Sequence, residues 1–203
     1  MIRLIKLFFL IFIINSSTAY ASSDLRAYEA LENKDYKKAL FYLSYDANLG
    51  DDRAQYNLGI MYKKGLGVLI NNNEAFGWFF LSAEQGNILA NYALGNSYNK
   101  GEGVKINYPL AYKAFKYASL REHPLSKINL GAMYFFGNGI QKDYSKAYLW
   151  WRLSADLNIN GARKNIEMLS KKMNDNEKNK GLQLYEDCCL LYTSPSPRDG
   201  RES

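Results

Sequence analysis

The stretch LGIMYKKGLGV at residues 58–68 contains three glycines, and their role decides the fold. A dinucleotide-binding loop requires the pattern G-x-G-x-x-G, but Ile70 stands where the third glycine would fall. A P-loop requires Gly-Lys-Ser/Thr, which the chain lacks. The same pattern returns as LGNSYNKGEGV at residues 94–104 and LGAMYFFGNGI at residues 130–140, 36 residues apart each time. A motif repeated at a fixed spacing indicates a repeated structural unit and not a phosphate-binding loop.

Each unit is predicted to begin with a capped helix. Four units start at Asp35, Asn71, Asn107 and Asp143, and Asp and Asn are preferred helix N-caps. Within each unit, the fourth, eighth and twelfth residues after the cap are small, large and small, and these offsets share one helical face. The small residues at offset four are Ala39, Ala75, Ala111 and Ala147; the large ones at offset eight are Leu43, Phe79, Phe115 and Trp151; the small ones at offset twelve are Ala47, Ala83, Ser119 and Ala155.

A second helix is predicted in the other half of each unit, and glycines set its limits. Gly50 and Gly86 suit the end of the first helix, and Asp51 and Asn87 suit the start of the second. A glycine inside a helix costs about 1 kcal/mol relative to alanine, so its return at one position indicates that a neighbouring helix passes very close. The glycines inside the second helix are Gly59, Gly95 and Gly131; those expected to end it are Gly65, Gly101 and Gly137; those expected to bend the chain afterwards are Gly67, Gly103 and Gly139.

The later units depart from this pattern. In the third unit, Glu122-His123-Pro124 replaces the glycine and the cap, but proline is tolerated at the first helical position, so the second helix is still expected to start there. His123 is expected to be a solvent-facing turn residue. The fourth unit loses its glycine loop, as a terminal repeat commonly does. The predicted plan is a capping helix at 22–34, repeats at 35–70, 71–106, 107–142 and 143–173, the last degenerate, and a C-terminal capping helix at 174–188.

The pattern A-x-x-[WY]-x(4)-A-x-x-G followed by A-x(3)-L-G-x-x-Y-x-x-G-x-G-[VI] resembles the Sel1-like repeats, relatives of the tetratricopeptide repeats. The resemblance extends over residues 35–173 and is closest in the first two units. It implies an all-α fold, a right-handed α/α solenoid that holds partner proteins. Some exported members resemble scaffolds or regulators in envelope pathways. The cysteine-rich members, for which penicillin binding has been proposed, carry a disulfide in each repeat, and this chain lacks those cysteines.

Both ends of the chain carry segments that are excluded from the predicted fold. Arg3 and Lys6 precede an apolar run at residues 7–14 and the small-x-small sequence Ala19-Tyr20-Ala21, the order of a secretory signal peptide cleaved after Ala21. The alternative, a membrane anchor, would need about 20 apolar residues. CLLYTSPSPRD at residues 189–199 resembles translated sequencing-library adaptor, so residues 189–203 are interpreted as a non-native tail; the alternative is a native Ser/Pro-rich tail.

Composition argues against several functions. Between residues 22 and 188 there are 22 basic and 18 acidic residues, a net charge of +4, and the lysines are scattered, whereas nucleic-acid binding favours a clustered basic stripe. With a single histidine, His123, neither a His/Cys metal cluster nor a Ser-His-Asp triad can form. Asp51 and Asp52 lie at a helix start, where carboxylates favour the helix dipole. We therefore expect no enzyme activity, no cofactor and no metal.

The first helices also present residues outside the apolar stripe, at offsets six and nine, which in related solenoids line the concave groove. They vary from unit to unit and suggest a groove that is apolar toward the first repeats and basic toward the last; a solvated face with incidental aromatics is the alternative. The candidate partner-binding residues are Phe41, Phe80, Lys113, Lys116 and Arg152. The leading hypothesis is a monomeric, periplasmic or secreted, non-enzymatic scaffold for a protein or peptide. The second is an auxiliary glycan-binding or weakly hydrolytic protein.

Overall fold

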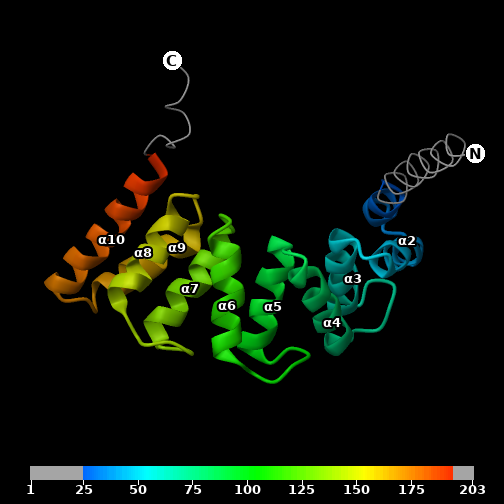
Figure 1. Cartoon of the computed structure of the whole chain (residues 1–203), viewed down its shortest axis with the longest axis horizontal. Helices are drawn as coiled ribbons and strands as arrows, with labels where there is room; N and C mark the ends of the chain where they lie inside the picture. Colours follow the sequence, from blue (N-terminus) through cyan, green and yellow to red (C-terminus); the bar gives the residue numbers. More distant parts are fainter. Residues whose placement is uncertain (1–24, 194–203) are drawn as a thin grey trace, which may run out of the picture. The chain divides into compact units, whose positions relative to one another are not determined.

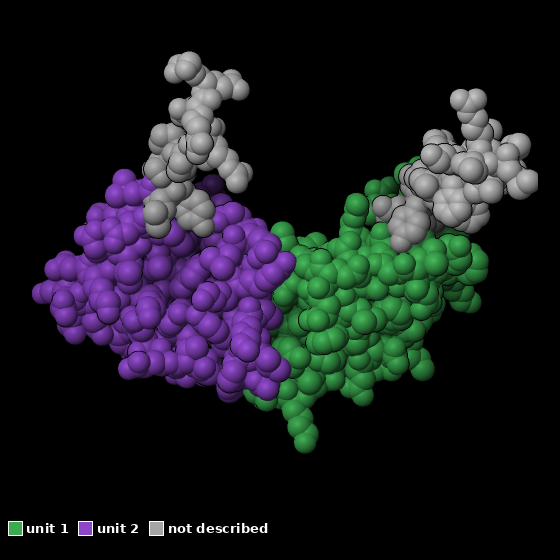
Figure 2. Space-filling view, viewed as in Figure 1, with its two compact units in different colours: residues 1–106 green, residues 107–203 purple. Residues whose placement is uncertain are grey.

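The computed structural model describes residues 25–193, with only the backbone at 191–193, and between those limits the chain is helical with no strand (Figure 1). The all-α prediction is confirmed. The predicted signal peptide at 1–21 lies outside the described residues, as does the predicted tail from residue 194 onward. The chain divides into two compact units, residues 1–106 and 107–203 (Figure 2).

Unit 1 contains a helical segment at residues 25–32 and four helices, each packed against the next in sequence. The helices are α2 (Tyr36–Asn48), α3 (Asp52–Lys64), α4 (Asn72–Glu84) and α5 (Ile88–Lys100). The pairs α2–α3 and α4–α5 are the two helices of repeats 1 and 2, and α3 also packs against α4. Every helix is therefore covered by a sequence neighbour, as expected for a repeat protein.

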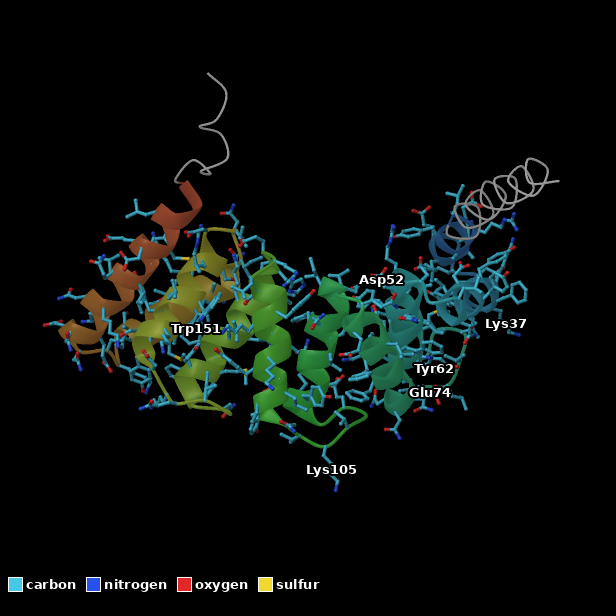
Figure 3. The ribbon with its side chains drawn as sticks, viewed as in Figure 1. Lys37, Asp52, Tyr62, Glu74, Lys105 and Trp151 are labelled. Carbon is cyan, nitrogen blue, oxygen red and sulfur yellow. The ribbon has the colours of Figure 1, made fainter. Side chains whose placement is uncertain are left out.

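Unit 2 repeats this arrangement and adds a long last helix. Its helices are α6 (Tyr108–Ser119), α7 (Pro124–Phe136), α8 (Tyr144–Ala155), α9 (Asn160–Ser170) and α10 (Asp175–Thr193). Helix α8 packs against α7, α9 and α10, and Trp151 lies among these helices (Figure 3). Helix α10 continues past residue 188, the predicted end of the C-terminal capping helix.

The predicted caps of the first helices are confirmed in all four repeats. The side chains of Asp35, Asn71, Asn107 and Asp143 each accept a hydrogen bond from a backbone N–H in the first turn of α2, α4, α6 or α8. Asp51 and Asn87 do the same for α3 and α5. These bonds satisfy amides that would otherwise lack a partner inside the helix. Single Asp and Asn side chains therefore mark where these helices begin.

The predicted apolar stripe of the first helices forms part of the core, together with residues of the second helices such as Leu58 and Leu130. The four alanines at offset four and the four large side chains at offset eight are all buried. Trp151 is the largest of them, and its Nε1 donates to the backbone oxygen of Ile128 in α7 at 3.0 Å. Buried serines add further links between helices: Ser82 Oγ donates to the backbone oxygen of Asp52 at 2.6 Å, and Ser154 Oγ donates to that of Pro124 at 3.0 Å.

The glycines take the structural positions that the sequence predicts for them. Gly59, Gly95 and Gly131 are buried inside α3, α5 and α7. A Cβ atom at Gly59 would lie 2.6 Å from the Phe79 ring, and one at Gly131 would overlap the Trp151 indole. Close helix crossing is thus the reason for glycine at these two positions. The C-caps Gly65, Gly101 and Gly137, and the loop residues Gly67, Gly103 and Gly139, all have a left-handed backbone.

Two turns keep the left-handed backbone without glycine. Gly50 and Gly86 have φ of 96° and 90°, and the matching residues of repeats 3 and 4, Glu122 and Asn158, have φ of 65° and 59°. The expectation that His123 faces solvent is wrong, because its side chain is half-buried and caps α7. Its Nδ1 accepts from the backbone N–H of Ser126 at 3.2 Å. Imidazole nitrogen therefore replaces the Asp or Asn oxygen used in repeats 1 and 2.

Candidate partner-binding surface

In unit 1, an exposed group of aromatic rings lies on α4 and α5. The ring centroids of Phe76 and Phe80 are 6.3 Å apart, and the Phe76 ring meets that of Tyr98 edge-on at 5.4 Å. Phe80 is 40% exposed, whereas Phe76 and Tyr98 are half-buried beneath it. Burial, and secondarily the charge of Glu84, raises the pKa of Tyr98. We call Phe76, Phe80 and Tyr98 the aromatic patch.

The other predicted residue of unit 1, Phe41, lies on α2. It is 71% exposed, and its ring contacts that of Tyr42 edge-on at 5.5 Å. The Arg26 guanidinium lies over the same Tyr42 ring, 5.9 Å from its centroid. Phe41 is thus an exposed apolar side chain with little support, whereas Phe80 rests on a packed aromatic base. Rigid aromatic side chains of the second kind are the usual anchors of protein interfaces.

In unit 2, lysines and tyrosines from α6, α7 and α8 contact one another. Lys116 Nζ lies 5.8 Å from the Tyr112 ring centroid, and Lys146 Nζ lies 5.5 Å from that of Tyr134. The two tyrosines meet edge-on, with their hydroxyl oxygens 3.0 Å apart. Burial, followed by the hydrogen bond to Tyr112, raises the pKa of Tyr134. We call Tyr112, Lys113, Lys116, Tyr134 and Lys146 the basic patch.

The charges of the basic patch are only partly neutralised. Lys146 pairs with Asp143, with 3.6 Å between Nζ and Oδ2. In the part of the chain that the structure describes, neither Lys113 nor Lys116 lies in an ion pair, and both are exposed. Two exposed positive charges, one of them over the Tyr112 ring, provide both attraction and contact area for an acidic partner.

Arg152 is the predicted residue whose surroundings the sequence does not reveal. Its Nε lies 3.9 Å from Asp156 Oδ1, and its guanidinium lies 5.3 Å from the centroid of the Tyr185 ring in α10. Tyr185 also donates its hydroxyl hydrogen to Asp156 at 2.9 Å. The hydrogen bond with Tyr185 is the main reason that the pKa of Arg152 is raised. Asp156 and Tyr185 thus give Arg152 an acidic and an aromatic contact within the chain itself.

The adjacent carboxylates Asp51 and Asp52 make structural hydrogen bonds. Asp51 Oδ1 accepts from the backbone N–H of Ala54 at 2.7 Å, and Asp52 Oδ2 accepts from Asn87 Nδ2 at 2.7 Å. Within residues 25–190, no cluster of three or more His, Cys, Asp or Glu side chains is placed to hold a metal ion. None of the described helices is long and apolar enough to cross a membrane.

Comparison with known proteins identifies the repeats. The Sel1 repeat model matches residues 28–51, 52–87, 88–121 and 124–159. The chain belongs to the Sel1 repeat family. Each full match begins with the second helix of one repeat and ends with the first helix of the next, so the family frame is offset from the 36-residue units counted from the caps. The three full matches thus combine α3 with α4, α5 with α6, and α7 with α8.

Two solved structures are similar to this chain to different degrees. A Sel1 repeat protein from Oxalobacter formigenes is 33% identical, with a TM-score of 0.66 over 71% of this chain and 59% of the other. The protective antigen c5321 of uropathogenic Escherichia coli is 22% identical, with a TM-score of 0.48 over 78% of this chain and 44% of the other. The chain therefore spans about half the length of these two proteins. No curated protein is similar enough in sequence to count as a relative.

Proposed function

We propose that this Sel1 repeat chain is an exported, non-enzymatic scaffold or regulator of the cell envelope that holds a protein or peptide partner. Sel1 repeats generally serve as protein-interaction scaffolds and are typically not enzymes. The main support for this proposal is the contrast between structural positions that recur in each repeat and surface positions that vary between repeats. Caps, alanines and glycines recur at fixed spacing, whereas offset nine of the first helices changes from Ser44 to Phe80, Lys116 and Arg152.

The two patches define the chemistry of the proposed partner. The aromatic patch favours an apolar side chain, because Phe80 presents an exposed ring beside Phe76, whose ring in turn meets Tyr98. The basic patch favours carboxylates, because Lys113 and Lys116 carry charge without an ion pair among the described residues. An apolar peptide side chain suits the aromatic patch of unit 1, and an acidic one suits the basic patch of unit 2, each patch by itself. Charged rims mainly raise the association rate, whereas aromatic anchors mainly slow dissociation.

Export to the periplasm or beyond is the second part of the proposal. It rests on the basic residues Arg3 and Lys6, the apolar run at 7–14 and the Ala19-Tyr20-Ala21 cleavage sequence. A reporter fusion to residues 1–30 should be exported with cleavage after Ala21, and the substitution Ala21→Asp should block that cleavage. Retention of the uncleaved reporter inside the cell would contradict export.

A glycan ligand is the alternative, and the exposed rings of Phe41 and Phe80 are the observation that favours it. Aromatic faces also stack on sugar rings, so an auxiliary role in polysaccharide metabolism would use the same residues. A weak glycoside hydrolase would need two carboxylates facing each other across a substrate. The adjacent pair Asp51 and Asp52 does not suit that task, because their oxygens already bond to Ala54 and Asn87.

The deciding experiment is a capture from envelope extract, followed by titration of the recovered protein. Wild type is compared with the double variant Lys113→Ala/Lys116→Ala and with Lys164→Ala, an exposed lysine on α9. We expect the double variant to associate more slowly and with a smaller salt dependence, and Lys164→Ala to resemble wild type. Binding of purified cell-wall polymer with no protein captured would instead support the glycan alternative.

A further inference from the structure

A hollow in unit 2 joins an apolar wall to a buried positive charge. It has a volume of about 300 Å³, and its wall includes Leu120, Trp150 and Leu153 together with Lys127 and Glu122. This volume is at the lower end of the range typical of small-molecule sites, which generally combine apolar walls with a few fixed polar groups. Cys188 of α10 lies on one side, and burial raises the pKa of its thiol, so it contributes a neutral surface.

The two charged residues of the hollow differ in how firmly they are held. Lys127 and Glu122 form an ion pair in which the lysine side chain is only 5% exposed and the glutamate side chain is 56% exposed. A buried ammonium needs a negative partner, whereas an exposed carboxylate can return to water at small cost. Glu122 is therefore the replaceable member of the pair.

Comparison between repeats indicates that this pair is not needed for the fold. The residues that match Lys127 are Gln55 and Asn91, which are also buried. Gln55 Nε2 donates to the backbone oxygen of Ala47 at 3.1 Å, and Asn91 Nδ2 donates to that of Ala83 at 3.3 Å. A neutral amide is thus sufficient at this position in repeats 1 and 2.

The partner of Lys127 also departs from the repeat pattern. Glu122 occupies the left-handed turn position that is glycine in repeats 1 and 2, with φ of 65°. A left-handed backbone is unfavourable for a residue with a side chain. Repeat 3 therefore has a buried charge, Lys127, where repeats 1 and 2 have a neutral amide. It also has a strained residue, Glu122, where they have glycine. Both residues line the hollow.

We propose that this hollow binds a small organic acid whose carboxylate replaces Glu122 on Lys127 and whose apolar group packs against Leu120, Trp150 and Leu153. The exchange keeps the buried ammonium paired and adds apolar contact that Glu122 does not provide. A free acid and the last residue of a peptide with an apolar side chain share this chemistry. None of the residues that line the hollow belongs to the basic patch, and the proposal does not depend on the proposed scaffold function.

The test uses 3-phenylpropionate with the full chain and follows the melting temperature and tryptophan fluorescence. We expect the acid to raise the melting temperature, while 3-phenylpropanamide, which lacks the charge, and acetate, which lacks the apolar group, do not. Glu122→Gln removes the competing carboxylate and should bind the acid at least about tenfold more tightly. An equal effect of the amide or of acetate, or no effect of the acid, would overturn the proposal.

A matched control keeps the test decisive if Glu122→Gln folds poorly. The double variant Glu122→Gly/Lys127→Gln restores the glycine and amide of repeat 1, so it should fold and lose the response to the acid. A response that persists in this variant would place binding elsewhere and refute the site. N-acetyl-phenylalanine separates the two sources of ligand: a larger shift than that of 3-phenylpropionate indicates a peptide end, and a smaller one indicates a free acid.

Discussion

Gly131 and Gly77 both lie inside helices, but their surroundings differ. A Cβ at Gly131 would overlap the indole of buried Trp151, whereas a Cβ at Gly77 would meet no atom within 4 Å. Gly131→Ala should therefore destabilise the protein by about 1–3 kcal/mol through overpacking. Gly77→Ala should stabilise it by up to about 1 kcal/mol, because alanine is the better helix former. Urea unfolding of both variants is the measurement, and a Gly131→Ala variant at least as stable as wild type would contradict the close-crossing argument.

His123 makes the stability of α7 depend on pH. Its Nδ1 accepts the capping hydrogen bond from Ser126, and an imidazole protonated there cannot accept. Burial lowers the pKa of His123 below its usual value of 6.5, so the unfolded chain binds this proton more readily than the folded chain. Stability should therefore fall as the pH decreases below about 6.5, and be fully restored above it.

The chain contains one histidine, so a single variant isolates this effect. His123→Asn, which copies the Asn87 cap of repeat 2, should keep the cap and lose the pH dependence between about pH 5 and 7. Thermal melting at several pH values in that range measures both properties. An unchanged pH dependence in His123→Asn would assign it to other groups.

At the scale of the helix, the features that could be predicted from the sequence are those set by residues close together along the chain. Asp35 and Asn71 cap helices through bonds to residues two or three positions away, and this spacing can be recognised in any sequence. The apolar stripe is equally visible, because offsets four, eight and twelve share one face. The Sel1 pattern then implies that the helices pack in pairs; the family match confirms the family, with its frame offset from the predicted units.

Contacts between distant residues are what the sequence does not predict. Arg152 contacts Tyr185, 33 positions later, because α10 packs against α8. No short-range sequence pattern predicts this contact. The hollow beside Lys127 is equally hidden, since Trp150 and Cys188 reach it from other helices. The exposed positions of the candidate surface could be predicted from helical periodicity, but their partners within the chain could not.

Phe80 and Arg152 should therefore respond differently to truncation. Phe80→Ala should leave the melting temperature almost unchanged and weaken the partner complex by about 1–2 kcal/mol, as expected for an aromatic anchor. Arg152→Ala should lower the melting temperature, because it removes the contacts with Asp156 and Tyr185. Thermal melting and titration of each variant separate the two effects, and an unchanged affinity in Phe80→Ala would remove the aromatic patch from the proposed binding surface.

At the scale of the whole molecule, the C-terminal helix contacts α8 through residues between 177 and 185. Ser145 Oγ donates to the backbone oxygen of Glu177 at 2.9 Å, and a Cβ at buried Gly181 would lie 3.1 Å from the Tyr148 ring. Tyr185 adds its hydrogen bond to Asp156. These three residues of α10 are four positions apart, so they lie on one face of the helix, and all precede residue 189.

Removal of residues 189–203 should accordingly leave the fold intact. A chain that ends at Cys188 keeps Glu177, Gly181 and Tyr185 against α8, so we expect its melting temperature to match that of the full chain. A chain that ends at Asn174 loses α10 entirely and exposes the face of α8 that contains Tyr148, so it should melt at a clearly lower temperature because apolar surface returns to water. Circular dichroism melting of both chains tests the contrast. Equal losses in the two would show that residues 189–193 anchor α10, and would argue against their interpretation as a non-native tail.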